Sequence, residues 1–331
     1  MQTFFSLLLL TSSSFLQHPT HSFRVITPST HSQLGRSRVC LHSLSSDSSA
    51  LEKCLIREYT TFFSPMEESF YADDVEFIDP LTSFVGIEKY KNNVDMLAGR
   101  TLLGSALFRD AYISLHSLKR LDSNTVETRW TLRVTVKILP WQPTARFSGI
   151  SVYSLGEDGK IRKQNDYWDS VNLQSGAYVE KTFFDGVKDF LGQLKKEVTA
   201  DMAANELPYE LLRRARRYEV RRYPEITVAE TVYTKRPEGY DRLGSYTGGS
   251  NENASKLDFF SPALMTIKDV EGGGRSKVMM WPLSFAAPGK TSKDPSVFPN
   301  PTLPKVVLKK VPSKVVAVRR FEMAATEPVV R

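Results

Sequence analysis

Hydrophobic positions change their period along the chain, and the change predicts helices first and long strands afterwards. From Leu51 to Tyr71 the apolar residues recur at helical spacing. A second helix is predicted over 87–97 and closed by Gly99. Between Thr125 and Leu139 the period becomes two, with apolar residues alternating with Glu, Arg, Thr and Lys. That alternation predicts a long strand with one buried and one solvent-facing side.

Further strands are predicted around this one. The segments 107–121, 146–155 and 161–171 have the same character, and the Gly-Glu-Asp-Gly run at 156–159 predicts a tight hairpin between the last two. An acidic turn leading into a short strand is predicted over 71–80. Two helices followed by consecutive antiparallel strands predict an α+β domain whose curved sheet wraps a helix.

A helical stripe follows this domain and leads to a linker. Over 177–205 the apolar positions lie on one face, while Lys188, Lys195 and Lys196 lie outside it. We expect a helix that packs on one edge of the first domain; a partner-binding helix is the alternative. The residues 200–206 are predicted to be a short linker.

Composition changes again after Leu207. The segment 209–222 contains six arginines, but Glu219 and Glu225 interrupt the run, and no aromatic interleaving, zinc ligands or recognition helix accompanies it. We therefore expect no nucleic-acid partner and interpret the arginines as a solvated helix face and strand edge. Strands are predicted over 218–224 and 227–231, and a short helix over 239–251.

Charge separates the two halves. Residues 208–331 hold 22 Lys and Arg against 13 Asp and Glu, whereas the rest holds 22 against 24. Any anionic partner is therefore expected to meet the second half. With 41% hydrophobic and 24% charged residues, the composition is that of a globular protein rather than of a disordered or fibrous one.

The N-terminal residues have the profile of a targeting segment. Residues 1–46 contain no acid, and arginines there lie among many Ser and Thr, which is typical of an organellar transit peptide. The longest apolar run, Phe4–Leu10, is too short to span a bilayer. We expect 1–50 to be an unstructured transit peptide directing the protein to the plastid, in the stroma or on the plastoglobule surface. A mitochondrial presequence, a bipartite presequence and a secreted or disordered tail remain alternatives.

Three features of the first half resemble a known fold. They are the stretch from Tyr71 to Pro80, the Phe84-x-Gly86 after it and the final strand over 164–171. They resemble the nuclear-transport-factor-like cone fold, also called SnoaL-like, and more narrowly its plant and algal branch. The resemblance implies a cone-shaped α+β domain over 51–176, followed by a helix and linker over 177–206, and carries over no activity.

Four features of the second half occur in the order of another family. They are a Tyr-Glu-x-Arg-x-Tyr opening at 218–223, a helix ending in Gly-Gly-x-Asn at 248–251, the Met265-Thr266 strand and a closing Ala-Val-Arg-x-Phe at 317–321. Together they resemble the SOUL haem-binding family. The resemblance implies a distorted antiparallel β-barrel with flanking helices over 207–331, and haem or another tetrapyrrole in a shallow apolar groove beside the first helix. Because SOUL domains continue well past the closing strand, we expect the barrel to be incomplete, with an open strand edge and a tendency to self-associate.

The resemblance also implies which residues bind the ligand. The candidates on the first helix and the strands are Lys235, Tyr240, Arg242, Leu243, Tyr246, Met265, Met279 and Trp281. Lys235 and Arg242 are expected to meet the propionates. Met279 and Trp281 are more often core residues than part of a ligand surface. All five histidines lie at or before residue 116 and both cysteines at or before residue 54, so the ligand is expected to bind without a strong axial ligand.

These features favour a plastid tetrapyrrole carrier or buffer rather than an enzyme, with no catalytic residue and no metal site. The first domain would then dock a partner such as an enzyme of tetrapyrrole metabolism. An alternative is a cavity enzyme of the isomerase or dehydratase kind in the first domain; its candidate residues are Asp79, His116, Tyr153, Asp166 and Tyr167. Asp79 is more simply a turn cap, and Asp166 and Tyr167 are expected to point to opposite faces and so not to line one cavity. A structural plastoglobule-associated protein without a ligand is the third possibility.

Overall fold

The computed structural model describes residues 49–174, 177–179, 182–195, 205–270, 274–285 and 290–319, in two compact units. Among these residues, the first unit contains 49–195 and Leu212–Glu219, and the second contains 205–211 and 220–319. The predicted transit peptide up to residue 48, most of the linker and residues 271–273 lie outside the described residues. No helix in the described part is long and apolar enough to cross a membrane.

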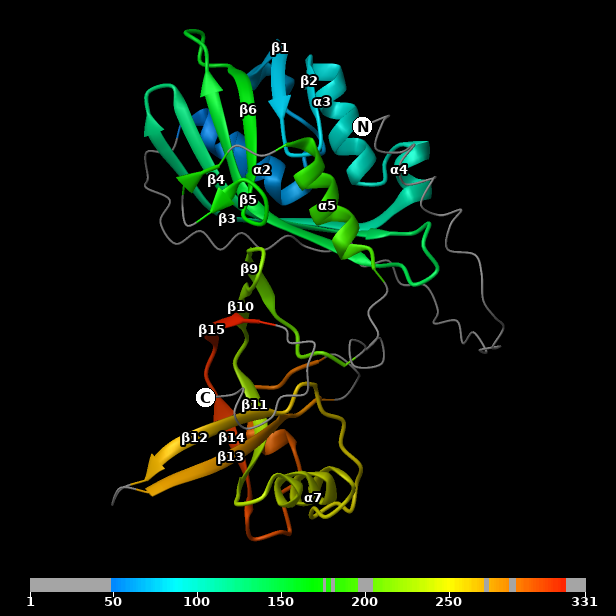
Figure 1. The fold of residues 1–331 in the computed structure, drawn as a ribbon, viewed down its shortest axis with the longest axis vertical. Helices are drawn as coiled ribbons and strands as arrows, with labels where there is room; N and C mark the ends of the chain where they lie inside the picture. Colours follow the sequence, from blue (N-terminus) through cyan, green and yellow to red (C-terminus); the bar gives the residue numbers. More distant parts are fainter. Residues whose placement is uncertain are drawn as a thin grey trace. The chain divides into compact units, whose positions relative to one another are not determined.

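A six-stranded sheet forms the body of the first unit (Figure 1). Its order is β2-β1-β6-β5-β4-β3, with β1 parallel to β6 and every other neighbouring pair antiparallel. The strands are β1 (Tyr71–Ile78), β2 (Ser83–Val85), β3 (Phe108–Asp122), β4 (Thr125–Val136), β5 (Thr144–Leu155) and β6 (Ile161–Trp168). A small pair, β7 (Leu173–Gln174) and β8 (Ala177–Tyr178), follows. The predicted α+β class is confirmed.

Helices cover one face of this sheet. They are α2 (Ala50–Thr61), the 3-10 turn η1 (Glu68–Phe70), α3 (Ile87–Leu97), α4 (Leu102–Leu107) and α5 (Phe183–Gln193). The hydroxyl of Tyr59 on α2 hydrogen-bonds with Ser151 and Tyr153, while Phe190 on α5 stacks on Phe147. Because alternate residues of β5 share a face, α2 and α5 meet the same side of the sheet. The expected packing of the 177–205 helix on the first domain is confirmed.

Two local predictions in the first unit are wrong. The first helix ends at Thr61 instead of continuing to Tyr71, because Phe62 and Phe63 adopt positive φ angles of 54° and 56°, which no helix continues through. The predicted acidic turn after it is strand β1, and a register shift between Tyr71 and Glu76 accommodates the exposed acids. The short helix α4, which ends where β3 begins, had no sequence prediction.

The second unit is built on a four-stranded antiparallel sheet of order β12-β13-β11-β14. Its strands are β11 (Ile226–Tyr233), β12 (Leu264–Val270), β13 (Gly274–Pro282) and β14 (Val306–Val311). Helix α7 (Arg236–Thr247) packs on one face of this sheet through Leu243 and Tyr246. A second sheet has the order β15-β10-β9, from β15 (Lys314–Val318), β10 (Glu219–Tyr223) and β9 (Glu210–Arg214); the 3-10 turn η2 spans Pro295–Val297. These antiparallel strands are of the kind that a SOUL-type barrel uses.

Most arginines of the arginine-rich segment are paired with acids. The prediction that these side chains are solvated is therefore wrong. In the first unit, the Arg213 Nε lies 3.1 Å from Asp169, and the Arg214 guanidinium lies 2.9 Å from Asp189. In the second unit, Arg221 is only 3% exposed; it contacts Glu206 at 2.7 Å and covers the ring of Tyr209. Arg222 pairs with Glu210. Such buried or half-buried pairs fix strands in place, because a guanidinium without its carboxylate would be costly to bury.

The sheet leaves no room for a side chain at Gly149, whereas helix α5 has room for one at Gly192. We therefore predict opposite effects on stability when each of these glycines is replaced by alanine. A Cβ at Gly149 would lie 2.1 Å from the carbonyl oxygen of Tyr167 on the next strand, whereas a Cβ at exposed Gly192 on α5 would meet nothing within 4 Å. We expect Gly149→Ala to lower the free energy of unfolding by about 1–3 kcal/mol through backbone displacement. Gly192→Ala is expected to raise it by up to about 1 kcal/mol through helix propensity.

Urea unfolding of the full chain, followed by tryptophan fluorescence, measures both changes. Equal unfolding midpoints for the two variants would contradict the close β5–β6 packing.

Candidate functional site

The eight residues predicted to bind a ligand separate into buried and exposed groups. Leu243, Tyr246 and Met279 are fully buried and Trp281 nearly so, and all four belong to the core between α7 and the sheet. Met279 therefore lies in the core, in agreement with its interpretation as a core residue. The remaining four, Lys235, Tyr240, Arg242 and Met265, are exposed or half-buried at or near the surface.

Exposed apolar residues of α7, of β12 and of the segment between them form a surface on the sheet face that carries α7, and we call it the α7–β12 surface. It consists of Tyr240, Gly244, Phe259, Met265, Ile267 and the edge of Trp281. Met265 pairs with Met279 and Ile267 with Lys277, so both β12 side chains lie on the sheet face that carries α7. Tyr240 is 42% exposed, Met265 39% and Ile267 59%. Exposed apolar groups that adjoin one another on a face usually mark a binding surface.

Contacts around Trp281 tie this surface together. Its ring stacks on Phe259 with centroids 4.2 Å apart, and the Tyr240 ring lies 6.0 Å away. A Cβ at Gly244 would lie 3.8 Å from the Trp281 ring, so the glycine leaves the space above the indole open. The buried indole N–H has no hydrogen-bond partner among the described residues. These residues fit a flat apolar molecule that carries polar groups at its edge.

Two cationic side chains flank α7. Lys235 is exposed at the N-cap position of the helix. Arg242 donates to the carbonyl oxygen of Val232 at 2.5 Å and lies 3.5 Å from Glu238. Because Arg242 is already engaged by two protein acceptors, Lys235 is the better placed of the two predicted propionate partners to meet a new anion.

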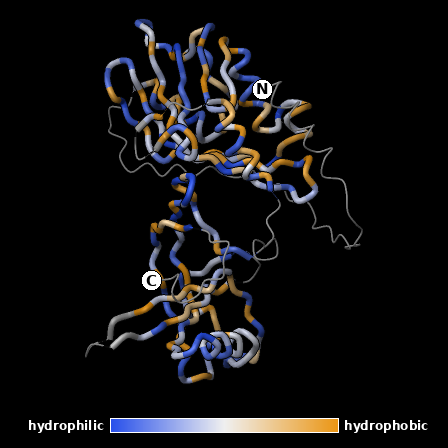
Figure 2. Tube along the Cα trace, in the orientation of Figure 1, coloured by the Kyte–Doolittle hydropathy of each residue, from blue (hydrophilic) through white to orange (hydrophobic). Residues whose placement is uncertain are grey.

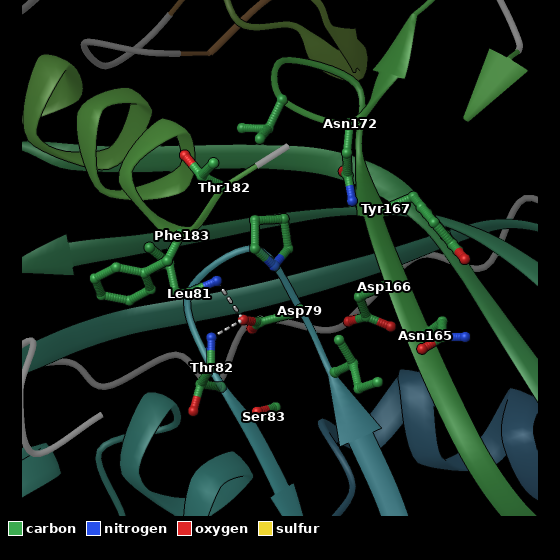
Figure 3. A pocket seen from close by; sticks show the side chains of 13 residues that line it. Asp79, Leu81, Thr82, Ser83, Asn165, Asp166, Tyr167, Asn172, Thr182 and Phe183 are labelled. Carbon is green, nitrogen blue, oxygen red and sulfur yellow. Dashed lines mark hydrogen bonds between the residues drawn. The ribbon is translucent and has the colours of Figure 1, made fainter. Parts of the chain in front are cut away.

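The first unit contains a separate pocket of about 420 Å³. It lies where β1 and β6 end and α5 begins (Figure 3). Its lining residues are Ile78, Asp79, Pro80, Leu81, Thr82, Ser83, Asn165, Asp166, Tyr167, Val171, Asn172, Thr182 and Phe183. In Figure 3 the carboxyl group of Asp79 is directed toward the backbone N–H groups of Leu81 and Thr82, and Asp166 lies on the neighbouring strand β6.

The two carboxyl groups are held by different contacts. One oxygen of Asp79 accepts from the backbone N–H groups of Leu81 (2.7 Å) and Thr82 (2.6 Å), which confirms the predicted turn cap. Asp166 accepts from the Gln164 amide at 2.8 Å. Burial raises the pKa of Asp79 to about 6 and that of Asp166 to about 7, and the nearby charge of Asp79 adds to the second shift.

A buried hydroxyl network lies behind Asp166. Ser151 accepts from the Trp130 indole (2.8 Å) and from Gln164 (3.3 Å), and the Tyr59 hydroxyl contacts both Ser151 and Tyr153. Tyr90 donates to the side-chain oxygen of Gln164, which fixes the amide so that its N–H₂ faces Asp166. The position of Asp166 is therefore set by residues from α3, β4, β5 and β6.

The structure brings together three of the five residues considered for a cavity enzyme. Tyr153 is buried in the hydroxyl network, and His116 hydrogen-bonds with Thr131 at 3.0 Å on β3 and β4; neither lines the pocket. Asp166 and Tyr167 both line it, so the expectation that they cannot share one cavity is wrong. Figure 3 shows Tyr167 directed away from Asp79, as strand alternation requires, and its ring packs on Tyr178 at 4.3 Å. The pocket reaches both residues because it lies at the end of the strand.

Several residues of the α7–β12 surface and of the pocket could not be predicted from any pattern in the sequence. Phe259 and Ile267 become part of the α7–β12 surface only through the β12–β13 pairing and the loop before it. Asn165 lines the same pocket as Asp79 because β1 and β6 run parallel side by side, and Asn172 lines it from the turn after β6. Among the described residues, no three His, Cys, Asp or Glu side chains gather as a metal site would require.

Comparison with known families identifies the domain in the second half of the chain. A family model described as "SOUL heme-binding protein" matches residues 204–331. The chain carries a SOUL domain. Residues 49–164, ahead of this SOUL domain, match the model of an uncharacterized conserved protein family, DUF2358. No curated protein sequence matches the chain.

Solved structures similar to this chain belong to the NTF2-like group. An NTF2-like protein of unknown function from Exiguobacterium sp. 255-15 is 22% identical, with 35% of this chain and 98% of that chain covered and a TM-score of 0.28. A putative polyketide cyclase from Pseudomonas putida is 11% identical, with 42% and 95% covered and a TM-score of 0.29. An epoxide hydrolase from M. tuberculosis is 14% identical, with 43% and 87% covered and a TM-score of 0.29. The six-stranded sheet of the first unit, covered by helices on one face, is the arrangement that the cone-fold prediction requires.

The raised carboxyl pKa values predict how stability depends on pH. Folding raises the pKa of Asp166 from about 3.9, the usual value for an unfolded chain, to about 7. The folded state therefore holds a proton that the unfolded state has released, and this contribution to stability is lost as the pH rises through 7. We expect the urea midpoint of the protein to fall between pH 6 and pH 8, and Asp166→Asn to reduce that fall.

Asp73→Asn, on the exposed side of β1, is the matched control and should leave the pH dependence unchanged. If the urea midpoint falls with pH equally in Asp166→Asn and in the unmodified protein, the attribution of this fall to Asp166 is contradicted.

Proposed function

We propose that the protein is a carrier or buffer of haem or another tetrapyrrole in the plastid, with the ligand held on the α7–β12 surface. The match of residues 204–331 to the SOUL haem-binding family carries this proposal. The exposed strip of Tyr240, Met265 and Ile267 supports it, because a porphyrin gains most of its affinity by covering apolar surface. A SOUL domain is a binding domain, so the proposed role is not enzymatic.

The residues present define the mode of binding that we propose. Apolar contact comes from Tyr240, Met265 and Trp281, and Gly244 leaves room for a flat ring beside the indole. Lys235, with Arg242 as a secondary partner, would offset the charge of the propionates. Residues 207–331 contain no histidine or cysteine, so the protein would hold haem without a strong axial ligand. Bound haem supplies an iron centre and a strong absorption band; the side chains bind and orient it.

We further propose that residues 1–50 direct the protein to the plastid stroma or plastoglobule surface, and that the first unit docks an enzyme of tetrapyrrole metabolism. The acid-free, Ser- and Thr-rich sequence of residues 1–46 supports the targeting role.

Variants of the α7–β12 surface test the tetrapyrrole site. We expect haem added to the full chain to give a shifted, saturable Soret band. Gly244→Leu, which fills the space beside Trp281, and the double variant Tyr240→Ala with Met265→Ala, which removes apolar surface, should each weaken binding at least about tenfold. The measurement is an absorbance titration at fixed ionic strength.

Val307→Ala is the matched control for this titration. Val307 on β14 is 51% exposed, but strand alternation places it on the opposite sheet face from Val306 and Leu308, which pack toward α7. Its substitution should leave haem binding unchanged. A full chain that does not alter the Soret band of haem would overturn the carrier function and favour a structural protein without a ligand.

Targeting has its own test. A fluorescent protein fused behind residues 1–50 is expected to accumulate in plastids of plant or algal cells, and substitution of Arg24, Arg36 and Arg38 by Glu should reduce import. Accumulation of the unmodified fusion in mitochondria or in the secretory pathway would contradict the plastid assignment.

A further inference from the structure

Tetrapyrrole binding leaves the pocket of the first unit without a role. Its volume of about 420 Å³ falls in the usual range for small-molecule sites. The lining combines two carboxyl groups with the polar side chains of Thr82, Asn165 and Asn172. It lies wholly within the first unit, between the ends of β1 and β6 and the start of α5 (Figure 3).

Charge restricts what this pocket accepts. Among the described residues that line it there is no lysine, arginine or histidine, whereas Asp79 and Asp166 both belong to the lining. The N-terminus of α5 also lies at the pocket, but the Asp185 carboxylate accepts from the Thr182 N–H and hydroxyl, both at 3.0 Å, and so opposes the positive end of the helix dipole. An anion such as a tetrapyrrole propionate would therefore be repelled, and a cation would be attracted.

Apolar groups at the pocket restrict the ligand further. Leu81, Val171 and the partly exposed ring of Phe183 line it. The exposed Phe184 ring lies beside Phe183 with centroids 5.9 Å apart. The exposed ring of Tyr178 packs on Tyr167, another lining residue. Exposed aromatic rings next to a charged pocket are suited to a ligand with an apolar body and a cationic head.

We propose that this pocket binds a small organic ammonium compound, with the ammonium group between Asp79 and Asp166 and an apolar, aromatic body against Phe183. The free oxygen of Asp79 is available for this contact, because its other oxygen already accepts the two backbone N–H groups of the turn. Asp166 is held ready by Gln164, so binding requires little rearrangement.

Binding a cation here releases protons. The ionisable groups at the site are Asp79, directly after β1, and Asp166 and Tyr167 on β6. Behind them lie Tyr59, Tyr90 and Tyr153, whose pKa values burial raises so that they stay neutral. With a pKa of about 7, Asp166 holds a proton in much of the protein at pH 6, and an ammonium ligand must displace it. An alkylammonium stays charged over this range, as lysine does. Affinity should therefore rise with pH.

Calorimetric titration of the full chain tests the proposal with three probes of nearly equal shape. They are 2-phenylethylammonium, neutral 2-phenylethanol and anionic 3-phenylpropanoate. We expect saturable binding of the ammonium compound, an affinity about tenfold higher at pH 8 than at pH 6, and weaker or no binding of the other two. At pH 7, the heat measured in buffers of different ionisation enthalpy should show proton release, which needs no variant.

Asp166→Asn should lower the affinity for 2-phenylethylammonium at pH 8 at least about tenfold and abolish its pH dependence. Asp73→Asn is the control and should change neither. Far-UV circular dichroism establishes that both variants are folded, and if Asp166→Asn is not, the proton-release measurement on the unmodified protein decides alone. Failure of the ammonium compound to bind, or equal binding of the alcohol without pH dependence, would overturn the proposal. Neither result bears on haem binding by the second unit.

Discussion

The hydroxyl group of Tyr59 organises the polar interior of the first unit. It lies in the core, where an unpaired hydroxyl would be costly, and it contacts Thr128, Ser151 and Tyr153 at 2.8, 3.3 and 3.0 Å. Helix α2 is thereby fixed against β4 and β5 by polar contacts as well as by apolar packing. Through Ser151 and Gln164 the same network extends to Asp166. A carboxyl group at the pocket is thus positioned by residues in the centre of the domain.

The two units differ in the kind of surface they offer to ligands. In the SOUL domain the candidate surface is exposed and apolar, formed by residues of α7, β12 and their neighbours, and Lys235 lies at the N-cap of α7. Figure 2 shows that hydrophobic and hydrophilic positions both occur along the trace of this unit. In the first unit the candidate site is a pocket whose lining combines two acids, several polar side chains and the aromatic rings of Tyr167 and Phe183. The first arrangement suits a large flat anion, and the second suits a small cation.

Much of the fold could be predicted from the sequence, because the relevant signals are local. Alternation over 125–139 identified β4, and the Gly156–Gly159 turn identified the β5–β6 hairpin. The ordered motifs at 218–223 and 248–251 identified the SOUL domain. The errors arose where backbone geometry or distant partners decide the structure. The residue type at position 62, a phenylalanine, gives no indication that its backbone adopts a positive φ angle. The partners of Arg213 and Arg214, Asp169 and Asp189, are far away in sequence. The candidate sites were predictable only as residue types: Tyr240 and Met265 are exposed and Leu243 is not, a difference that depends on how α7 lies on the sheet.

The pairing of the arginine-rich segment changes the meaning of the basic second half. Four of its guanidinium groups, those of Arg213, Arg214, Arg221 and Arg222, are already matched by carboxylates within their own units. These ion pairs hold the strands in place, and at a distance the positive charge of each arginine is largely cancelled by its carboxylate partner. The positive potential close to this segment is therefore weaker than its six arginines alone would produce, although pairing leaves the net charge of the chain unchanged, and discrimination among ligands falls to contact at short range.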